Sequence, residues 1–175
     1  MAFAEQYRAT VDAAYREYQA AVSGTADRKM DGALFLHADA DPLRALGSAP
    51  ETHPAQLEAA MERLNVAGVE VDMRHGSMSY SPSAVAGQPG RLILDPEASY
   101  GAVLHEMSHF SDDEGAGFPS LRYWLEDPAV TAAGESRAYE AEIHYANSIR
   151  EPEIAGQLEE LRAQLISQLR GENDE

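Results

Sequence analysis

The segment of this sequence best suited to metal chemistry is residues 105–109, which read His-Glu-Met-Ser-His. On a helix, His105 and His109 lie four residues apart and project from one face, so both imidazoles can bind a single metal ion. Glu106 directly follows the first histidine, where its carboxylate can reach a water on that metal and accept its proton. Apolar residues on both sides favour a buried helix. The segment therefore predicts a hydrolytic metal centre, against the alternative of a surface helix with two unrelated histidines.

Zinc needs a third protein ligand, with the fourth position left to water. The best candidate is Glu135, because residues 134–147 are rich in helix-forming residues. Within them, Ala138, Ala141 and Tyr145 recur at the spacing of one buried helical face. The intervening chain is long enough for a turn, a short helix and a return. We therefore expect a second helix that packs against the first and brings Glu135 to the two histidines.

Other acidic residues are alternative third ligands. Glu142 lies seven residues after Glu135 and shares its helical face. Asp112 and Asp113 follow the motif closely, and three ligands spread along one helix could not converge on a tetrahedral ion. Carboxylates at a helix C-terminus oppose its dipole, which indicates that one of these acids has a purpose, such as a hydrogen bond to His109.

A hydrolytic centre also needs a donor for the developing oxyanion. Tyr139 lies one helical turn after Glu135 and is the preferred catalytic candidate, although packing is the commoner role of a tyrosine in a small domain. The other candidates are Tyr145, His144 and Tyr123, of which Tyr145 falls on the face expected to pack in the core.

The remaining sequence predicts an α+β fold that positions these residues. Amphipathic helices are expected at residues 3–22, 54–66 and 152–170, and strands at 69–73, 77–80 and 91–95. The turn at residues 74–76 suggests that the first two strands form a hairpin. The chain is expected to form one domain, residues 1–175, with a mainly helical flank (1–66), short strands (67–95), catalytic helices (99–147) and a C-terminal helix (152–170).

A strand leading into the His-Glu-Met-Ser-His helix, with Glu135 and then the small Ala138 on a second helix, resembles the zincin metallopeptidases, in particular the glutamate zincins. The resemblance covers about residues 91–147. It implies a zincin-like α+β fold with a small mixed or antiparallel sheet, whose edge strand, residues 91–95, lies beside the metal and pairs with extended substrate. Those families often carry an aspartate that orients a histidine where this chain has Tyr139.

The resemblance further implies Zn²⁺ held by His105, His109 and Glu135, and peptide-bond hydrolysis with Glu106 as general base. The layout is similar to metallopeptidase domains found as bacterial effectors or polymorphic toxins, which implies a protein or peptide substrate and a cognate inhibitor or delivery partner. Two alternatives stay open. One is a zincin-like binding module without catalysis, and the other is metal-dependent hydrolysis of a non-peptide amide.

Composition narrows the classes of function. The chain has no cysteine, so any metal must be bound by nitrogen and oxygen atoms. Its formal net charge of −17, with Lys29 as the one lysine, argues against nucleic acid as a partner. Neither a membrane-spanning segment nor a secretion signal is evident, so we expect no membrane partner and a location in the cytoplasm or export by specialised machinery.

Overall fold

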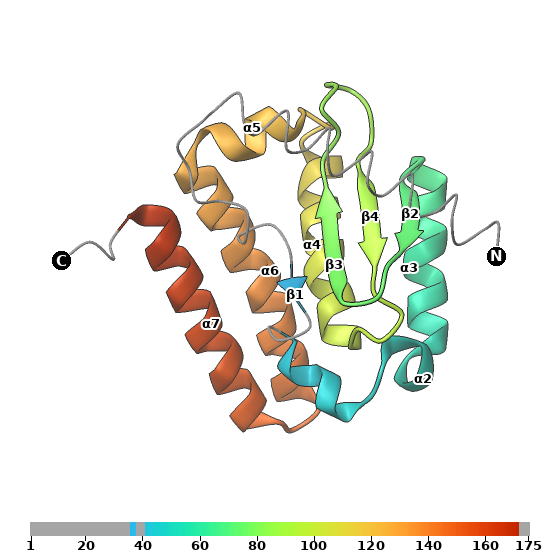
Figure 1. The fold of residues 1–175 in the computed structure, drawn as a ribbon, viewed down its shortest axis with the longest axis vertical. Helices are drawn as coiled ribbons and strands as arrows, with labels where there is room; N and C mark the ends of the chain where they lie inside the picture. The colour runs from blue at the N-terminus through green and yellow to red at the C-terminus, as the bar shows by residue number, and fades with distance from the viewer. Residues whose placement is uncertain (1–35, 38–40, 172–175) are drawn as a thin grey trace.

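The computed structural model describes residues 36–37 and 41–171 and has the expected α+β character (Figure 1). The first elements, in chain order, are β1 (Leu36–His37), the 3₁₀ helix η2 (Pro42–Leu46), α2 (Ala49–Thr52), α3 (Pro54–Ala67), β2 (Glu70–Met73), β3 (Ser77–Ser81) and β4 (Arg91–Leu94). They are followed by α4 (Tyr100–Gly115), α5 (Leu121–Glu126), α6 (Pro128–Ser148) and α7 (Pro152–Arg170). The helix predicted at residues 3–22 lies outside the described residues.

The predicted hairpin between residues 69–73 and 77–80 is wrong. The strands lie in the order β1-β3-β4-β2, so β4 separates the two expected partners. β2 runs parallel to β4, with Glu70 opposite Arg91, and β3 runs antiparallel to β4 on its other side. The turn at residues 74–76 therefore crosses over the end of β4 and spans two strand spacings, about 9.6 Å, instead of one.

The prediction of an edge strand at residues 91–95 is also wrong, because β4 is hydrogen-bonded on both sides. Its residues Leu92, Ile93 and Leu94 are all buried, as expected for an interior strand. The strand that packs against the motif helix α4 is β3. Contacts between the sheet and the motif on α4 are therefore made chiefly by residues of β3.

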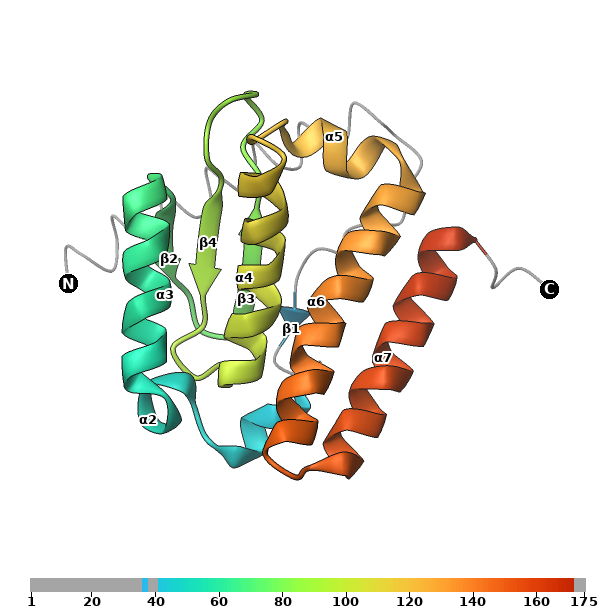
Figure 2. The same ribbon diagram turned by 180° about the vertical axis from the view of Figure 1, so that it is seen from behind.

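The helices form layers beside the sheet. Figure 2 shows α4 lying along the face of the sheet, with α3 on one side of it and α6 and then α7 on the other. One core cluster joins the sheet to α3 and α4 around Leu64, Met78 and Phe110, and a second joins α6 to α7 around Ile143 and Leu158. Helix α4 consequently has the sheet on one side and α6 on another. Within the described residues, no helix is long and apolar enough to cross a membrane.

Candidate metal centre

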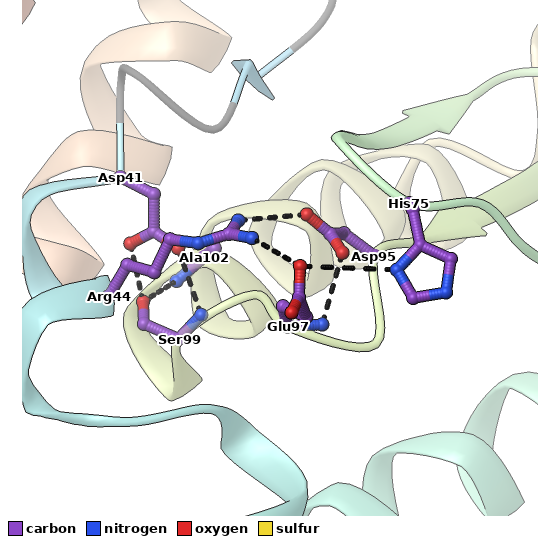
Figure 3. Close-up of polar contacts among 7 residues, drawn as sticks. All are labelled: Asp41, Arg44, His75, Asp95, Glu97, Ser99 and Ala102. Carbon is purple, nitrogen blue, oxygen red and sulfur yellow. Dashed lines mark hydrogen bonds and ion pairs between the residues drawn. The ribbon is translucent and has the colours of Figure 1, made fainter.

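The N-terminus of α4 is fixed by a buried carboxylate (Figure 3). Ser99 caps the helix by accepting a hydrogen bond from the main-chain N–H of Ala102 at 3.1 Å. Its own hydroxyl and N–H donate to Asp41 at 2.6 and 2.8 Å. Gly101 lets the 3₁₀ helix η2 approach closely, because a Cβ there would lie 2.2 Å from Leu43 Cδ1. These contacts set where α4 begins and so the direction in which its motif side chains point.

The structure brings His105 and His109 of α4 to Glu135 of α6. His105 Nε2 lies 3.5 Å from Glu135 Oε2, and His109 Nε2 lies 3.4 Å from Glu135 Oε1. One potential ligand atom from each of the three residues lies within 4.8 Å of the others. His105 and Glu135 are buried, whereas His109 is partly exposed and leaves the group open to one side. Ala138, the small residue three positions after Glu135, is fully buried in α6.

These distances can be compared with those around a metal ion, with the two separations ending on different oxygens of Glu135. Two ligand atoms bound to one zinc at about 2.0–2.2 Å lie about 3.3–3.6 Å apart, the length of a tetrahedron edge. Both histidine–glutamate separations fall in this range. Two imidazole nitrogens and one carboxylate also form a donor set typical of catalytic zinc. The three side chains therefore offer a donor set and a spacing that could hold a metal ion.

The electrostatics of the same three groups are strongly coupled. Burial alone would raise the pKa of Glu135, but the charge of His109 and hydrogen bonds with both histidines lower it to about 2. Burial alone would lower the pKa of each histidine, yet contacts with Glu135 raise both above their ordinary value. The raised pKa values favour protonated imidazoles, whose positive charge would face Glu135. A divalent cation at this position would supply the same charge and displace the protons.

Glu142 approaches the other ring nitrogen of His105. Its Oε1 lies 2.6 Å from His105 Nδ1, and the carboxylate is fully buried. A carboxylate on the second nitrogen fixes the tautomer that leaves Nε2 free to bind metal. Burial raises the pKa of Glu142 to about 7 despite its bond to His105. From this position Glu142 contacts Nδ1 of His105 and could orient the ring, whereas the sequence indicated only that it shares a face with Glu135.

Glu106 lies beside these groups and is held by the sheet. It is buried, and its Oε2 accepts a hydrogen bond from the main-chain N–H of Tyr80 in β3 at 2.5 Å. Burial raises the pKa of Glu106, opposed by the charges of His105 and His109. A raised pKa suits a group that must accept and then return a proton near neutral pH. Sequence reasoning did not single out Tyr80.

Tyr139, the predicted oxyanion donor, packs against His105. Their rings meet edge to face with centroids 4.9 Å apart. Burial, followed by the nearby carboxylates, raises the pKa of its hydroxyl, so the hydroxyl keeps its proton. Tyr139 also belongs to the apolar cluster between α6 and α7. Its position beside His105 agrees with either packing or catalysis, and the catalytic role stays a prediction. Of the other candidates, Tyr145 lies 3.2 Å from His53 Nε2, and His144 and Tyr123 are exposed.

The two aspartates after the motif have other partners than the metal group. Asp112 accepts hydrogen bonds from the guanidinium of Arg137 at 2.8–3.2 Å. Asp113 is buried and accepts from the Tyr80 hydroxyl and from Trp124 Nε1, each at 2.7 Å. The hydrogen bonds of these two acids thus go to Arg137, Tyr80 and Trp124, and not to His109 as expected. Asp113 instead connects α4 to β3 and α5.

A pocket opens beside His109 and Glu135. Its volume is about 40 Å³, enough for a few water molecules or a small side chain. Residues of the end of β3, of α5 and of the start of α6 form its walls, among them Pro82, Leu121, Trp124, Leu125 and Val130. The partly exposed side of the candidate centre thus faces a small, largely apolar pocket.

A second group of potential ligands has an ordinary explanation. His75, Asp95 and Glu97 also bring ligand atoms within 4.8 Å of one another (Figure 3). However, Arg44 occupies the group and donates to Asp95 and to Glu97 at 2.9 Å each. His75 and Glu97 are exposed. These contacts describe an ion pair that ties the loop before α4 to η2, and not a metal centre.

Comparison of the chain with protein-family models, with curated proteins and with solved structures found no match. The functional assignment therefore depends on the geometry of the site alone.

Proposed function

We propose that this chain is a zinc-dependent endopeptidase whose metal is held by His105, His109 and Glu135. The observation that carries the proposal is that both histidine Nε2 atoms lie 3.4–3.5 Å from the two oxygens of one buried carboxylate. A further buried acid, Glu142, contacts the other ring nitrogen of His105 and orients the ring. Metal centres with this donor set and a nearby unliganded glutamate are typical of metal-assisted hydrolysis.

Each residue has a distinct task in the proposed reaction. When bound, zinc would polarise the scissile carbonyl and lower the pKa of a water molecule toward neutrality. Glu106 accepts the proton of the attacking water and delivers it to the departing amine. The Tyr80 N–H engages Oε2 of Glu106, which leaves Oε1 for the water. Tyr139, beside His105, is the proposed donor to the oxyanion.

The position of Glu106 favours catalysis over a purely structural metal site. Structural zinc is usually enclosed by four protein ligands. Here His109 is partly exposed and opens on the pocket, so one side of the group stays accessible. A buried glutamate with a raised pKa near the two histidines is costly for stability, and a general base explains its presence. The same constellation would also hydrolyse a non-peptide amide, which substrate tests can separate.

The test is the variant Glu106→Gln, compared with wild type and with the exposed control Glu160→Gln. We expect Glu106→Gln to bind zinc as the wild type does, yet to cleave a denatured protein substrate at least ~100-fold more slowly, as loss of a general base should cause. Zinc content is measured by metal analysis and cleavage by mass spectrometry of the products. Full activity in Glu106→Gln would exclude the mechanism, and a wild type that binds zinc without cleaving peptides or small amides would favour a binding module.

A further inference from the structure

Helix α4 presents two buried carboxylates to a single residue of the sheet. Glu106 and Asp113 lie seven residues apart, two turns along one face of α4. Glu106 accepts the main-chain N–H of Tyr80 at 2.5 Å, and Asp113 accepts its side-chain hydroxyl at 2.7 Å. Tyr80 is therefore attached to α4 at both its backbone and its side chain, and the distance between strand and helix is fixed at two points.

The Tyr80 side chain is held from further directions. The N–H of Gly90 donates to its hydroxyl at 3.2 Å, and its ring meets Phe110 edge to face. A Cβ at Gly90 would lie 2.8 Å from the hydroxyl oxygen and 2.2 Å from a main-chain oxygen of β3, so only glycine permits this approach. These contacts hold the side chain of Tyr80 in one position, in the same residue whose main-chain N–H reaches Glu106.

Burial of the Asp113 carboxylate is unfavourable for the stability of the core. Asp113 is 1% exposed, and both of its hydrogen-bond donors, the Tyr80 hydroxyl and Trp124 Nε1, are neutral groups. A buried carboxylate without a close positive partner reduces stability compared with an apolar residue of similar size. Stability alone therefore does not explain it. Its two bonds instead connect the residue that holds Glu106 to Trp124 in the wall of the pocket.

We propose that Asp113 and the Tyr80 hydroxyl are positioning residues, which fix the N–H of β3 that orients Glu106 and place the Trp124 wall relative to it. This inference rests on the proposed function, in which Glu106 is the general base. Neither group touches the reacting atoms. Their effect passes through the Tyr80 backbone, so it alters the rate of the chemical step without altering the metal ligands.

The variants Tyr80→Phe and Asp113→Leu test the proposal. Tyr80→Phe removes only the hydroxyl and keeps the ring and the backbone N–H. Asp113→Leu removes both bonds of the carboxylate, whereas Asp113→Asn can still accept from Trp124 and donate to the Tyr80 hydroxyl, and so should restore most of the function. Glu114→Gln is the matched control, since it removes a charge from the next position of α4 but from an exposed pair with Arg63.

Two measurements on the full chain are needed. The first is the hydrogen-exchange rate of the residue 80 amide by NMR, which needs no activity. The second is the split between kcat and KM in zinc-loaded protein. In Tyr80→Phe and Asp113→Leu we expect amide exchange to rise about tenfold and kcat to fall about 10- to 100-fold, with KM and zinc affinity changed less than about threefold. The fluorescence of Trp124, the single tryptophan of the chain, should shift in Asp113→Leu alone.

The outcomes separate this inference from the proposed function. An unchanged residue 80 amide in both variants, or a loss of kcat no greater than in Glu114→Gln, would overturn the positioning role. A wild type that shows no zinc-dependent hydrolysis would overturn the proposed function and with it the catalytic purpose of the contact. Loss of amide protection together with loss of kcat, and recovery of both in Asp113→Asn, supports the proposal.

Discussion

Replacing Glu142 by glutamine is expected to weaken zinc binding although Glu142 is not a proposed ligand. Its Oε1 lies 2.6 Å from His105 Nδ1 and is fully buried, so the pair is shielded from water. Glutamine keeps the shape and an acceptor oxygen but loses the negative charge. His105 then donates to a neutral carbonyl, its Nε2 becomes a poorer donor to metal, and the amide can rotate to present the wrong group to Nδ1.

The expected size follows from this geometry. Loss of a carboxylate behind a metal-binding histidine typically costs about 10- to 100-fold in metal affinity, or about 1.4–2.8 kcal/mol. The contact here is short, buried and charge-assisted, which places it in the upper part of that range. The other oxygen, Oε2, has no hydrogen-bond partner among the described residues. The whole effect should therefore pass through His105.

The assay is competition for zinc against a chromophoric chelator, with protein concentration and pH held constant. Glu140→Gln serves as control, because it removes the same charge from an exposed position of α6. Glu135→Gln should weaken binding more than Glu142→Gln does, since it alters a proposed ligand. Equal zinc affinity in wild type and Glu142→Gln, with a marked loss in Glu135→Gln, would refute the orienting role.

Two further predictions concern pH and packing. Although burial opposes it, contacts with carboxylates raise the pKa values of His105 and His109, so both rings retain protons that zinc must displace. Apparent zinc affinity should therefore be greatest above those pKa values and should fall with decreasing pH, by up to about 100-fold per pH unit once both protons compete. Calorimetry in buffers of different ionisation enthalpy should detect the release of these protons. A zinc affinity that is independent of pH would contradict this prediction. Gly101→Ala should destabilise the fold by about 1–3 kcal/mol, because its Cβ would overlap Leu43. A Cβ at Gly156 in α7 meets no atom within 4 Å, so Gly156→Ala should stabilise the fold by about 0.5–1 kcal/mol. Chemical denaturation that gives the two variants equal stability would contradict the packing argument.

Helices α3 and α7 were predictable because each carries its signals locally. The predicted helix at residues 54–66 corresponds to α3, and the predicted bounds 152–170 match α7. Apolar periodicity and terminating residues depend only on nearby positions, so they can be read without knowledge of the packing.

The pairing of the strands was not predictable in the same way. Alternation of apolar and polar residues shows which face of a strand is buried, but not which strand lies beside it. The short turn at residues 74–76 suggested a hairpin, whereas the chain crosses the end of β4 there. The edge position expected for β4 came instead from the resemblance to zincins, and the strand lies inside the sheet.

For the candidate site, sequence spacing identified residues that the structure brings together, but not all of their contacts. The four-residue spacing of His105 and His109 implied a shared face, and the structure places Glu135 opposite both. Glu142 was recognised as sharing the face of Glu135, yet which histidine nitrogen it reaches depends on the rotation of α6 against α4. The contact of Tyr80 with Glu106 could not be predicted, because it is made by a main-chain N–H that almost any residue provides.

All three proposed ligands come from two separate helices that pack side by side, α4 and α6 (Figure 2). A bound ion would act as a cross-link between them, and every unfolding event that separates them would have to release it. At free zinc ~1,000-fold above its dissociation constant, this linkage adds about 4 kcal/mol to the free energy of unfolding. Metal supply would then govern the lifetime of the protein as well as its chemistry, since zinc-starved molecules would open more often and become substrates for proteolysis.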